Sequence, residues 1–225
     1  MKKIMFNDRY DLTLKVLRGQ KTQTRREVPE GIMRMAKMEV RELGGDLAER
    51  IKDHTPYCYT EKVAIAQSYH ELAKILAERG GKRTDDKLDK YYLARQSGRV
   101  CDTDAGWNNK MFVKADLMPH QVRITGIKVE RLQDISTNDC LAEGLDDDCG
   151  EGIHPYWWSI DHNKHEDWRK ISDEVACHGF DRHGKPCTYY WETAQSAYKA
   201  LIDRLDKTMW ERNPLVFAYT FELIR

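Results

Sequence analysis

The chain of 225 residues is long enough to bury a hydrophobic core, as one decorated domain or as two small ones. Its 37 basic and 37 acidic residues give a formal net charge of zero, which excludes a general electrostatic attraction to nucleic acid or membrane and restricts such binding to a local patch. Hydrophobic residues at 40% and charged residues at 33% describe a polar chain that still folds.

The chain shows no sign of export or of membrane insertion. The N-terminal Met-Lys-Lys is followed by no apolar region of a signal peptide, and no apolar run reaches the roughly eighteen residues that a transmembrane helix needs. The six cysteines include no CxxC pair, so reduced thiols are expected. We therefore predict a cytoplasmic protein without a membrane partner.

The first 26 residues predict a strand, a helix and a basic turn. A short strand is expected over 3–6, and the next apolar residues follow helical spacing at Tyr10, Leu14 and Leu17. Asn7 or Asp8 can cap this helix, and Gly19 stands where a left-handed residue would end it. The segment 19-GQKTQTRR-26 then forms an exposed basic turn.

The middle of the chain mixes weak and strong signals. Residues 30–55 are charged and have no clear period, whereas 61–68 alternate like a strand. A helix is expected next, with apolar residues Tyr69, Leu72, Ala73 and Leu76 and a stop at Gly80-Gly81. The polar segment 82–109 is interpreted as an inserted surface segment.

Residues 120–135 predict a long strand whose apolar phase changes at Gly126, which indicates a β-bulge or a sharp bend. Ser136 is placed to cap a short helix over 137–144, with Asp139 in the capping-box position and Gly144 as its end. Residues 146–187 are rich in Asp, His, Trp and Cys and show little periodicity.

The C-terminal part predicts a long amphipathic helix followed by a strand. The helix has apolar residues at Trp191, Ala194, Tyr198, Leu201 and Leu205, and the strand covers 214–224. One α+β domain spanning 1–225, with insertions near 30–55, 82–109 and 146–187, accounts for these elements.

Three segments resemble one known family. Gly19, Lys21 and Arg26 stand in the pattern G-x-K-x-x-x-x-R after a first helix, which is similar to the signature of the ASCH superfamily of PUA-like β-barrels. The stretches 122-VRITGIKVERLQDISTNDCLAEGL-145 and 210-WERNPLVFAYTFELI-224 resemble the phage and prophage branch of that family. The resemblance implies a PUA-like barrel with flanking helices and a link to RNA.

A bacterial branch of this superfamily consists of amidohydrolases that deacylate N4-acetylcytidine. Those enzymes use a Lys and a Thr of the turn and a Glu of the following helix, and the residues on these positions are Lys21, Thr24 and Glu143. The resemblance thus implies these three as catalytic residues, with Gly19, Arg25 and Arg26 binding the ligand. No cofactor and no metal are expected, and the partner is a modified nucleoside or RNA.

The chemistry of these residue types is consistent with that role. Neutral Lys can act as a base toward a Thr hydroxyl, but Lys21 needs burial or nearby cations such as Arg25 to lower its pKa. The helix end at Gly19 acts in the opposite direction because it favours a charged Lys. Glu143 falls in the last turn of its helix, where the dipole disfavours a carboxylate, as suits a proton donor.

Alternatives to catalysis stay open at this point. The basic turn is equally suited to binding phosphate or carboxylate without chemistry, as a PUA-like RNA or nucleotide module does, or to being merely solvated. Thr24 can bond within its own turn, and Glu143 can simply pair with Lys21 or an Arg. A third hypothesis is a phage-encoded interaction protein whose insertions contact another protein.

Two further clusters carry alternatives of their own. A metal site is conceivable from six residues, His162, His165, Cys177, His178, His183 and Cys187, but no CxxC anchors it and a solvated loop is the favoured interpretation. Four indoles could stack on bases or fill the packing around the core, and packing is favoured for Trp107, Trp157, Trp158 and Trp168.

Overall fold

The computed structural model of this chain describes residues 1–78, 86–147, 156–157, 176–177, 189–191 and 193–224. Five strands form the main sheet, in the order β1 (Lys3–Ile4), β3 (Lys62–Ile65), β4 (Gln121–Arg131), β9 (Leu215–Ile224) and β2 (Gln23–Glu27). A small sheet has the order β5 (Asp146–Asp147), β6 (Tyr156–Trp157), β8 (Tyr189–Trp191) and β7 (Ala176–Cys177). The helices are α1 (Leu12–Leu17), α2 (Glu30–Leu43), α3 (Leu47–Asp53), α4 (Tyr69–Glu78), α5 (Asp86–Gln96), α6 (Thr137–Ala142), α7 (Ala194–Leu205) and α8 (Met209–Arg212).

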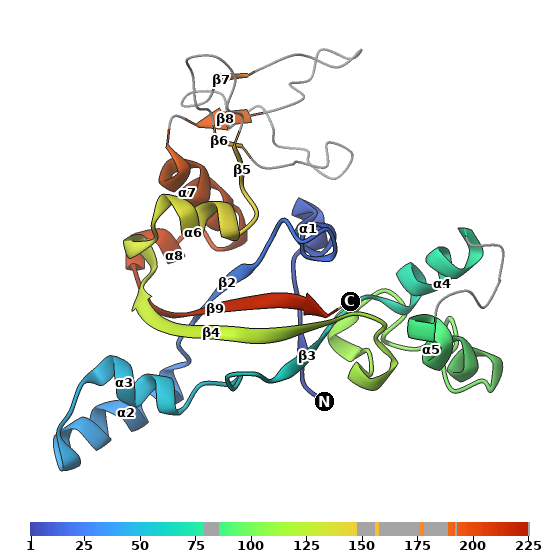
Figure 1. The fold of residues 1–225 in the computed structure, drawn as a ribbon, viewed down its shortest axis with the longest axis horizontal. Helices are drawn as coiled ribbons and strands as arrows, with labels where there is room; N and C mark the ends of the chain where they lie inside the picture. The colour runs from blue at the N-terminus through green and yellow to red at the C-terminus, as the bar shows by residue number, and fades with distance from the viewer. Residues whose placement is uncertain (79–85, 148–155, 158–175, 178–188, 192, 225) are drawn as a thin grey trace.

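The fold is α+β, as the sequence predicts. Within the main sheet β1 runs parallel to β3, and the other neighbouring strands are antiparallel. β1 and β2 lie at the two edges, so the sheet is open in the part of the chain that the structure describes (Figure 1). The long strands β4 and β9 cross the middle of the molecule, and the helices gather around them.

The predicted irregularity at Gly126 is confirmed. The register of β4 against β9 shifts between Ile124 and Gly126, which marks a bulge. Gly126 stands opposite Thr220, and an added Cβ would lie 3.3 Å from the Thr220 side chain. A larger residue would therefore press on β9 where the two strands bend.

The N-terminal helix is interrupted, which corrects the predicted apolar stripe. Asn7 caps a 3-10 turn, η1 (Asp8–Tyr10), through the backbone N–H of Arg9. Asp11 then takes a left-handed φ of 54°, and α1 starts with a new phase. As a result Leu12 and Val16 are buried, whereas the predicted core residue Leu14 is 40% exposed.

Two hydrophobic clusters cover the two faces of β3. Val63 and Ile65 belong to the larger cluster, and Ala64 and Ala66 belong to the second one. This follows from the alternation of side chains along a strand whose two faces are both covered. The strand predicted within 61–68 is therefore confirmed, and Ala64 and Ala66 on its other face are as buried as their neighbours.

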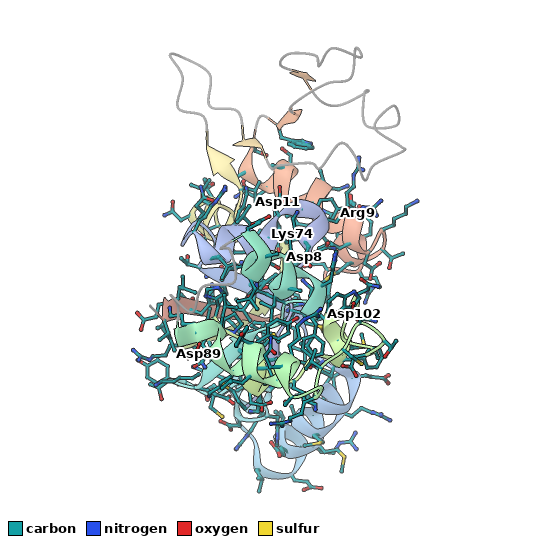
Figure 2. All side chains as sticks on the ribbon, turned by 90° about the vertical axis from the view of Figure 1, so that its right-hand side faces the viewer. Asp8, Arg9, Asp11, Lys74, Asp89 and Asp102 are labelled. Atoms are coloured by element: carbon teal, nitrogen blue, oxygen red, sulfur yellow. The ribbon has the colours of Figure 1, made fainter. Side chains whose placement is uncertain are left out.

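The second cluster corrects the interpretation of 82–109 as a surface segment. Leu88, Tyr91 and Val100 from this segment are buried against Tyr69 and Leu72 of α4. Figure 2 shows this end of the molecule with charged side chains at its surface. The polar composition thus reflects only the outer face of α5. The helix end predicted at Gly80-Gly81 lies outside the described residues.

Helices α2 and α3 were missed because most of their side chains face solvent. They pack against each other at one end of the sheet, and their fully buried residues are Ala36 and Ile51 (Figure 1). With so few buried positions, charged residues dominate the pattern of 30–55. None of the described helices is long and apolar enough to cross a membrane.

The helices around the candidate site confirm the predicted caps with one correction. The Ser136 hydroxyl accepts a hydrogen bond from the Asp139 N–H at the start of α6, and Gly144 has a left-handed φ of 98° after its end. α7 starts at Ala194 behind a Thr193 cap, so Trp191 is not part of it and belongs to β8. The apolar spacing had placed Trp191 in the same helix as Ala194, but the cap at Thr193 ends β8 and begins α7 between them.

Candidate active site

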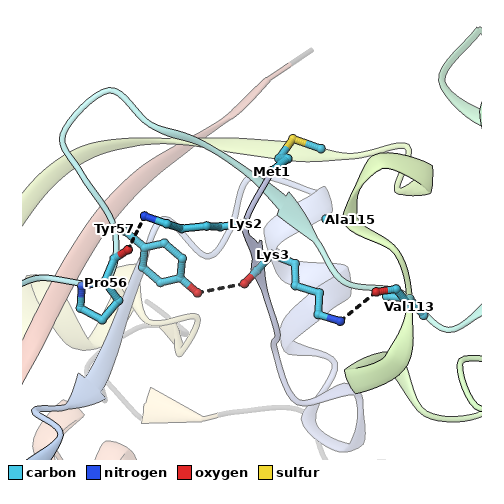
Figure 3. A pocket seen from close by; sticks show the side chains of 7 residues that line it. All are labelled: Met1, Lys2, Lys3, Pro56, Tyr57, Val113 and Ala115. Carbon is cyan, nitrogen blue, oxygen red and sulfur yellow. Dashed lines mark hydrogen bonds between the residues drawn. The ribbon is translucent and has the colours of Figure 1, made fainter. Parts of the chain in front are cut away.

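Two pockets of similar size lie on different parts of the molecule. The first has a volume of about 570 Å³ and lies beside β1 (Figure 3). Its two lysines are already bound to the backbone, since Lys2 donates to the Pro56 carbonyl at 2.7 Å and Lys3 donates to the Val113 carbonyl at 2.8 Å. The Lys2 side chain is 51% exposed, so this pocket offers ordinary solvated cations.

The second pocket has a volume of about 530 Å³ and contains the predicted catalytic residues. Its polar lining includes Lys21, Thr24, Arg25, Glu143 and Tyr198. An apolar wall comes from α1 and α7 through Leu12, Leu201 and Ile202, and basic side chains are contributed by Arg9, Arg26 and Lys110. The structure thus brings Lys21, Thr24 and Glu143 together from distant positions in the sequence.

The end of α1 sets the position of Lys21. Gly19 takes a φ of 75° just after the helix, as its place in the sequence predicts. The backbone N–H groups of Gln20 and Lys21 then both donate to the Lys15 carbonyl, at 2.8 and 3.1 Å. These bonds turn the chain sharply and place Lys21 between α1 and α6.

The last carbonyls of α6 fix the other side of the site. Helix ends leave carbonyl groups without partners, and here three consecutive ones receive donors from the N-terminal segment. The Thr22 N–H donates to the Ala142 carbonyl at 2.8 Å, and the Lys21 ammonium donates to the Glu143 carbonyl at 2.7 Å. Lys15 completes the set by donating to the Gly144 carbonyl at 2.6 Å. The turn and the helix end are therefore held together as one unit.

Lys21 and Glu143 form a buried ion pair. The Lys21 Nζ lies 2.5 Å from Glu143 Oε2, and the two side chains are only 2% and 5% exposed. Burial lowers the pKa of Lys21 below its usual range, against the attraction of Glu143, and Arg26 and Arg25 lower it further. Desolvation thus outweighs the helix end at Gly19, which favours a charged Lys.

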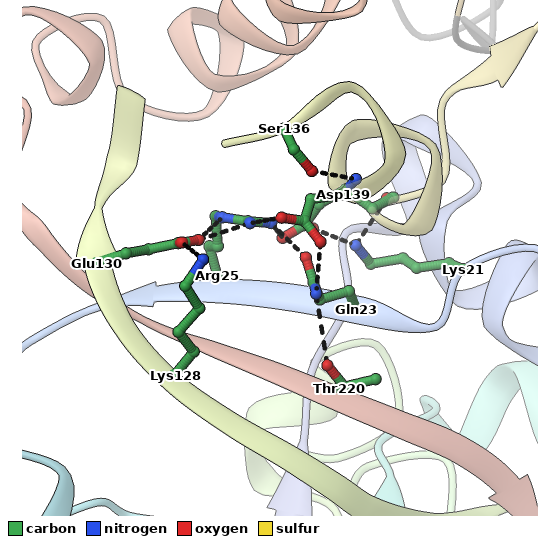
Figure 4. A network of polar contacts seen from close by, with 9 residues as sticks. Lys21, Gln23, Arg25, Lys128, Glu130, Ser136, Asp139 and Thr220 are labelled. Atoms are coloured by element: carbon green, nitrogen blue, oxygen red, sulfur yellow. Dashed lines mark hydrogen bonds and ion pairs between the residues drawn. The ribbon is translucent and has the colours of Figure 1, made fainter. Parts of the chain in front are cut away.

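Arg25 is the central cation of the network around this pair (Figure 4). Its Nη1 lies 3.1 Å from Glu143 Oε1, and its Nε and Nη2 donate to Glu130 Oε1 at 3.0 and 2.7 Å. Nη1 also donates to Gln23 Oε1 at 2.6 Å, and Nη2 lies 3.2 Å from Asp139 Oδ2. Arg25 therefore holds Glu143 in place, which agrees with the alternative that Glu143 pairs with Lys21 or an Arg.

The remaining predicted ligand residues differ in their placement. Arg26 is exposed, lines the pocket and donates to the Met5 carbonyl. Gly19 is exposed outside the pocket lining, so it shapes the turn. Thr24 is 5% exposed, and its hydroxyl makes no hydrogen bond with the residues the structure describes. The bond within its own turn, considered as an alternative, is not formed.

Sequence reasoning missed two residues of the site. Glu130 is buried at the end of β4, where an acidic residue in a strand is usually expected to face solvent. Tyr198 was counted in the apolar stripe of α7, although it lines the pocket and is 2% exposed. The only available signal was the number of basic residues in 19–26, which must find acidic partners if they are buried.

A metal centre has no support in the described residues. They contain no group of three or more His, Cys, Asp or Glu side chains that could hold an ion. Most positions of the His and Cys cluster between His162 and Cys187 lie outside the described residues, and so do the side chains of Cys177, Trp157, Trp158 and Trp168. Trp107 lies within the described residues and packs against the second hydrophobic cluster. The Arg95 Cζ lies 4.7 Å from the centre of the Trp107 ring.

Comparisons of this chain with protein-family models, with curated protein sequences and with solved structures give no significant match. The arrangement of the pocket therefore has to be interpreted from its own geometry.

Proposed function

We propose that this protein is an amidohydrolase that removes the acyl group from a modified nucleoside of the N4-acetylcytidine type. The observation that carries the proposal is the meeting of Lys21, Thr24 and Glu143 in one buried pocket. These are the three positions at which the chain resembles the deacylating branch of the ASCH superfamily. A base, a nucleophile and a proton carrier are the groups that acyl transfer requires.

The depressed pKa of Lys21 supports its role as the base. A neutral amine accepts the proton of the Thr24 hydroxyl while the Thr24 oxygen attacks the amide carbonyl carbon. The Thr24 hydroxyl is available because it has no hydrogen bond within the described residues. The new C–O bond gives a tetrahedral intermediate with the charge on the former carbonyl oxygen.

Glu143 completes the proton balance. When the C–N bond breaks, the proton that Lys21 took from Thr24 passes across the 2.5 Å contact between Lys21 and Glu143 to the Glu143 carboxylate, which delivers it to the leaving amine. Water then attacks the Thr24 ester, Lys21 takes a proton from the water, and Glu143 passes this proton from Lys21 to the Thr24 oxygen as the ester bond breaks. The sum is an amide and water converted to an amine and a carboxylic acid, with the enzyme restored.

The PUA-like barrel belongs to the same proposal. The bulge at Gly126 bends β4 against β9, which is the device that sheets use to curl toward closure. The apolar wall from Leu12, Leu201 and Ile202 gives one face suited to the flat side of a base. Together these features support a small nucleoside ligand over a long nucleic acid, in line with the zero net charge.

A second candidate is a non-catalytic module of the PUA-like type that binds a nucleotide or RNA in this pocket. It is favoured by the pairing of the charges in the pocket floor, Lys21 with Glu143 and Arg25 with Glu130, which is the arrangement of a structural network. Exposed Arg26 at the pocket then supplies a cation for a phosphate.

One experiment separates the two candidates. The protein is incubated with N4-acetylcytidine, and cytidine and acetate are measured by chromatography for the wild type, Lys21→Met and Lys15→Met. Lys15 is the matched control because it is also a buried lysine that donates to a carbonyl after α6, yet it does not line the pocket.

We expect turnover by the wild type and by Lys15→Met, and a fall in kcat of about 10³-fold for Lys21→Met. Equal losses in the two lysine variants would mean that only stability had changed, and would remove Lys21 from the chemistry. Binding of the nucleoside by the wild type without any release of acetate would contradict the hydrolase and support the binding module.

A further inference from the structure

Tyr198 is the second hydroxyl of the pocket and has no role in the steps above. It lies on α7, its side chain is almost fully buried, and its ring packs edge-on against Trp210 at 6.4 Å. The pocket lining places it with Lys21, Thr24 and Glu143. A ring held in this way fixes the direction of its hydroxyl.

The hydroxyl of Tyr198 has no hydrogen-bond partner among the described residues. Other buried or half-buried tyrosines of this protein do have one: Tyr91 donates to the Tyr69 carbonyl at 2.7 Å, and Tyr57 donates to the Lys3 carbonyl at 3.0 Å. The Tyr219 hydroxyl likewise lies 2.8 Å from that of Thr55. The Tyr198 oxygen is not among the fully buried side-chain atoms that lack a partner, so it is open to the pocket. Tyr198 therefore differs from these other tyrosines because its hydroxyl takes its partner from the pocket.

The surroundings of Tyr198 determine which kind of partner fits. Burial and the carboxylate of Glu143 raise the pKa of Tyr198 well above its usual range, against the opposing effect of Arg25. The phenol therefore stays neutral and presents an O–H donor to the pocket. A donor of this kind fits an acceptor oxygen, such as the carbonyl oxygen of an amide.

We infer that the Tyr198 hydroxyl donates a hydrogen bond to the carbonyl oxygen of the bound amide and stabilises the negative charge on that oxygen after Thr24 attacks. The carbonyl electron pair moves onto the oxygen when the C–O bond forms and returns when the C–N bond breaks, and the Tyr198 proton stays on the phenol throughout. This inference rests on the proposed function. It adds to the proposed steps a neutral donor of the pocket that can bind the developing charge.

The test compares Tyr198→Phe with Tyr219→Phe. Both changes delete one buried hydroxyl, but the Tyr219 hydroxyl is bonded to Thr55 and does not line the pocket. For Tyr198→Phe we expect kcat for N4-acetylcytidine to fall by about 100-fold, KM to rise by up to about tenfold because the bond to the bound carbonyl oxygen is lost, and the melting temperature to stay unchanged or to rise. For Tyr219→Phe we expect unchanged kcat and a melting temperature lower by about 3 °C.

Three results would overturn the inference. An unchanged kcat in Tyr198→Phe is the first. The second is a melting temperature that falls as far as in Tyr219→Phe, because the hydroxyl would then be bonded within the fold, and this result needs no substrate. If the wild type binds N4-acetylcytidine without cleaving it, only the proposed function fails. The dissociation constant then tests the hydrogen bond from Tyr198, and we expect Tyr198→Phe to bind about tenfold more weakly. Equal binding by the wild type and Tyr198→Phe is the third contradicting result.

Discussion

Two pockets in the described part of the chain have nearly the same volume, but their lysines differ in burial. Beside β1, Lys2 remains half exposed and Lys3 spreads its ammonium between two carbonyls of one loop. In the second pocket Lys21 is 2% exposed and shares its partner Glu143 with Arg25. Water screens the first pair of cations, whereas the second site has to balance its charges internally. The difference in burial, and not the size of the cavity, distinguishes the second pocket as the candidate active site.

Lys15 sharpens this comparison inside one region. Lys15 and Lys21 are both buried and both donate to carbonyls that follow α6. Only Lys21 lines the pocket and forms an ion pair with Glu143 at 2.5 Å. A buried lysine is thus not sufficient for a site; what matters is a buried lysine that faces a cavity together with a hydroxyl and an acid.

Removing Arg25 should produce the largest effect. In Arg25→Met, Glu130 and Glu143 stay buried after losing their shared cation, and the free energy of unfolding should fall by about 3–5 kcal/mol. Urea unfolding followed by circular dichroism measures this change. If no such loss is measured, the buried network contributes no more to stability than an exposed ion pair, and the contrast in burial between the two pockets has no energetic consequence.

The matched control for this prediction is Arg123→Met. Arg123 pairs with Glu222 at 2.8 Å across β4 and β9, but the two side chains are 43% and 56% exposed. An exposed pair contributes at most about 1 kcal/mol. Equal losses in the two variants would show that the burial of Arg25 has no energetic consequence.

Gly144 should give the next largest effect because two separate costs coincide there. It has a left-handed φ of 98°, and an added Cβ would lie 3.3 Å from the Lys21 Cβ and 3.4 Å from the Lys15 Cδ. Gly144→Ala should therefore lower the free energy of unfolding by about 2 kcal/mol, and should reduce the rate of deacylation by moving Lys21. The measurement is urea unfolding together with the acetate assay.

Gly98 separates the two costs. It has a similar φ of 71°, but an added Cβ would have no neighbour within 4 Å. Gly98→Ala should thus show only the backbone cost of about 1 kcal/mol, with unchanged activity. If both alanine variants lost the same stability and neither lost activity, the close packing of Gly144 on Lys21 would have no functional meaning.

Local chain chemistry explains which parts of the molecule could be predicted. The end of α1 at Gly19, the cap at Ser136 and the bulge at Gly126 each depend on a few neighbouring residues, and the sequence contains them. The meeting of the turn with the end of α6 was expected only from a resemblance. Spacing alone does not reveal that Lys21 and Glu143 are in contact, because that contact spans 122 positions.

Burial explains what could not be predicted. Glu130 and Tyr198 are ordinary in sequence, one as a charged residue in a strand and the other as an aromatic residue in an apolar stripe. Their importance arises only when β4 and α7 place them beside Arg25 and the pocket. Helix α2 escaped prediction although Ile32, Ala36 and Val40 follow helical spacing, because charged residues fill most of the segment 30–55.

The pH dependence of stability tests whether Lys21 is the base that the pocket requires. Lowering its pKa in the folded state means that, between that value and the ordinary 10.5, the unfolded chain binds a proton that the folded chain has released. Stability then rises with pH across this window, by up to about 1.4 kcal/mol per pH unit, and is flat on either side of it. The difference in unfolding free energy between the wild type and Lys21→Met should therefore increase from neutral pH toward 10.5. Carbon-13 labelled lysine reports the deprotonation directly through the Lys21 Cε resonance.

A flat difference in unfolding free energy and an unshifted Lys21 resonance would mean that Glu143 keeps the Lys21 proton in place. The second pocket would then hold its cation as firmly as the carbonyls of the first pocket hold Lys3.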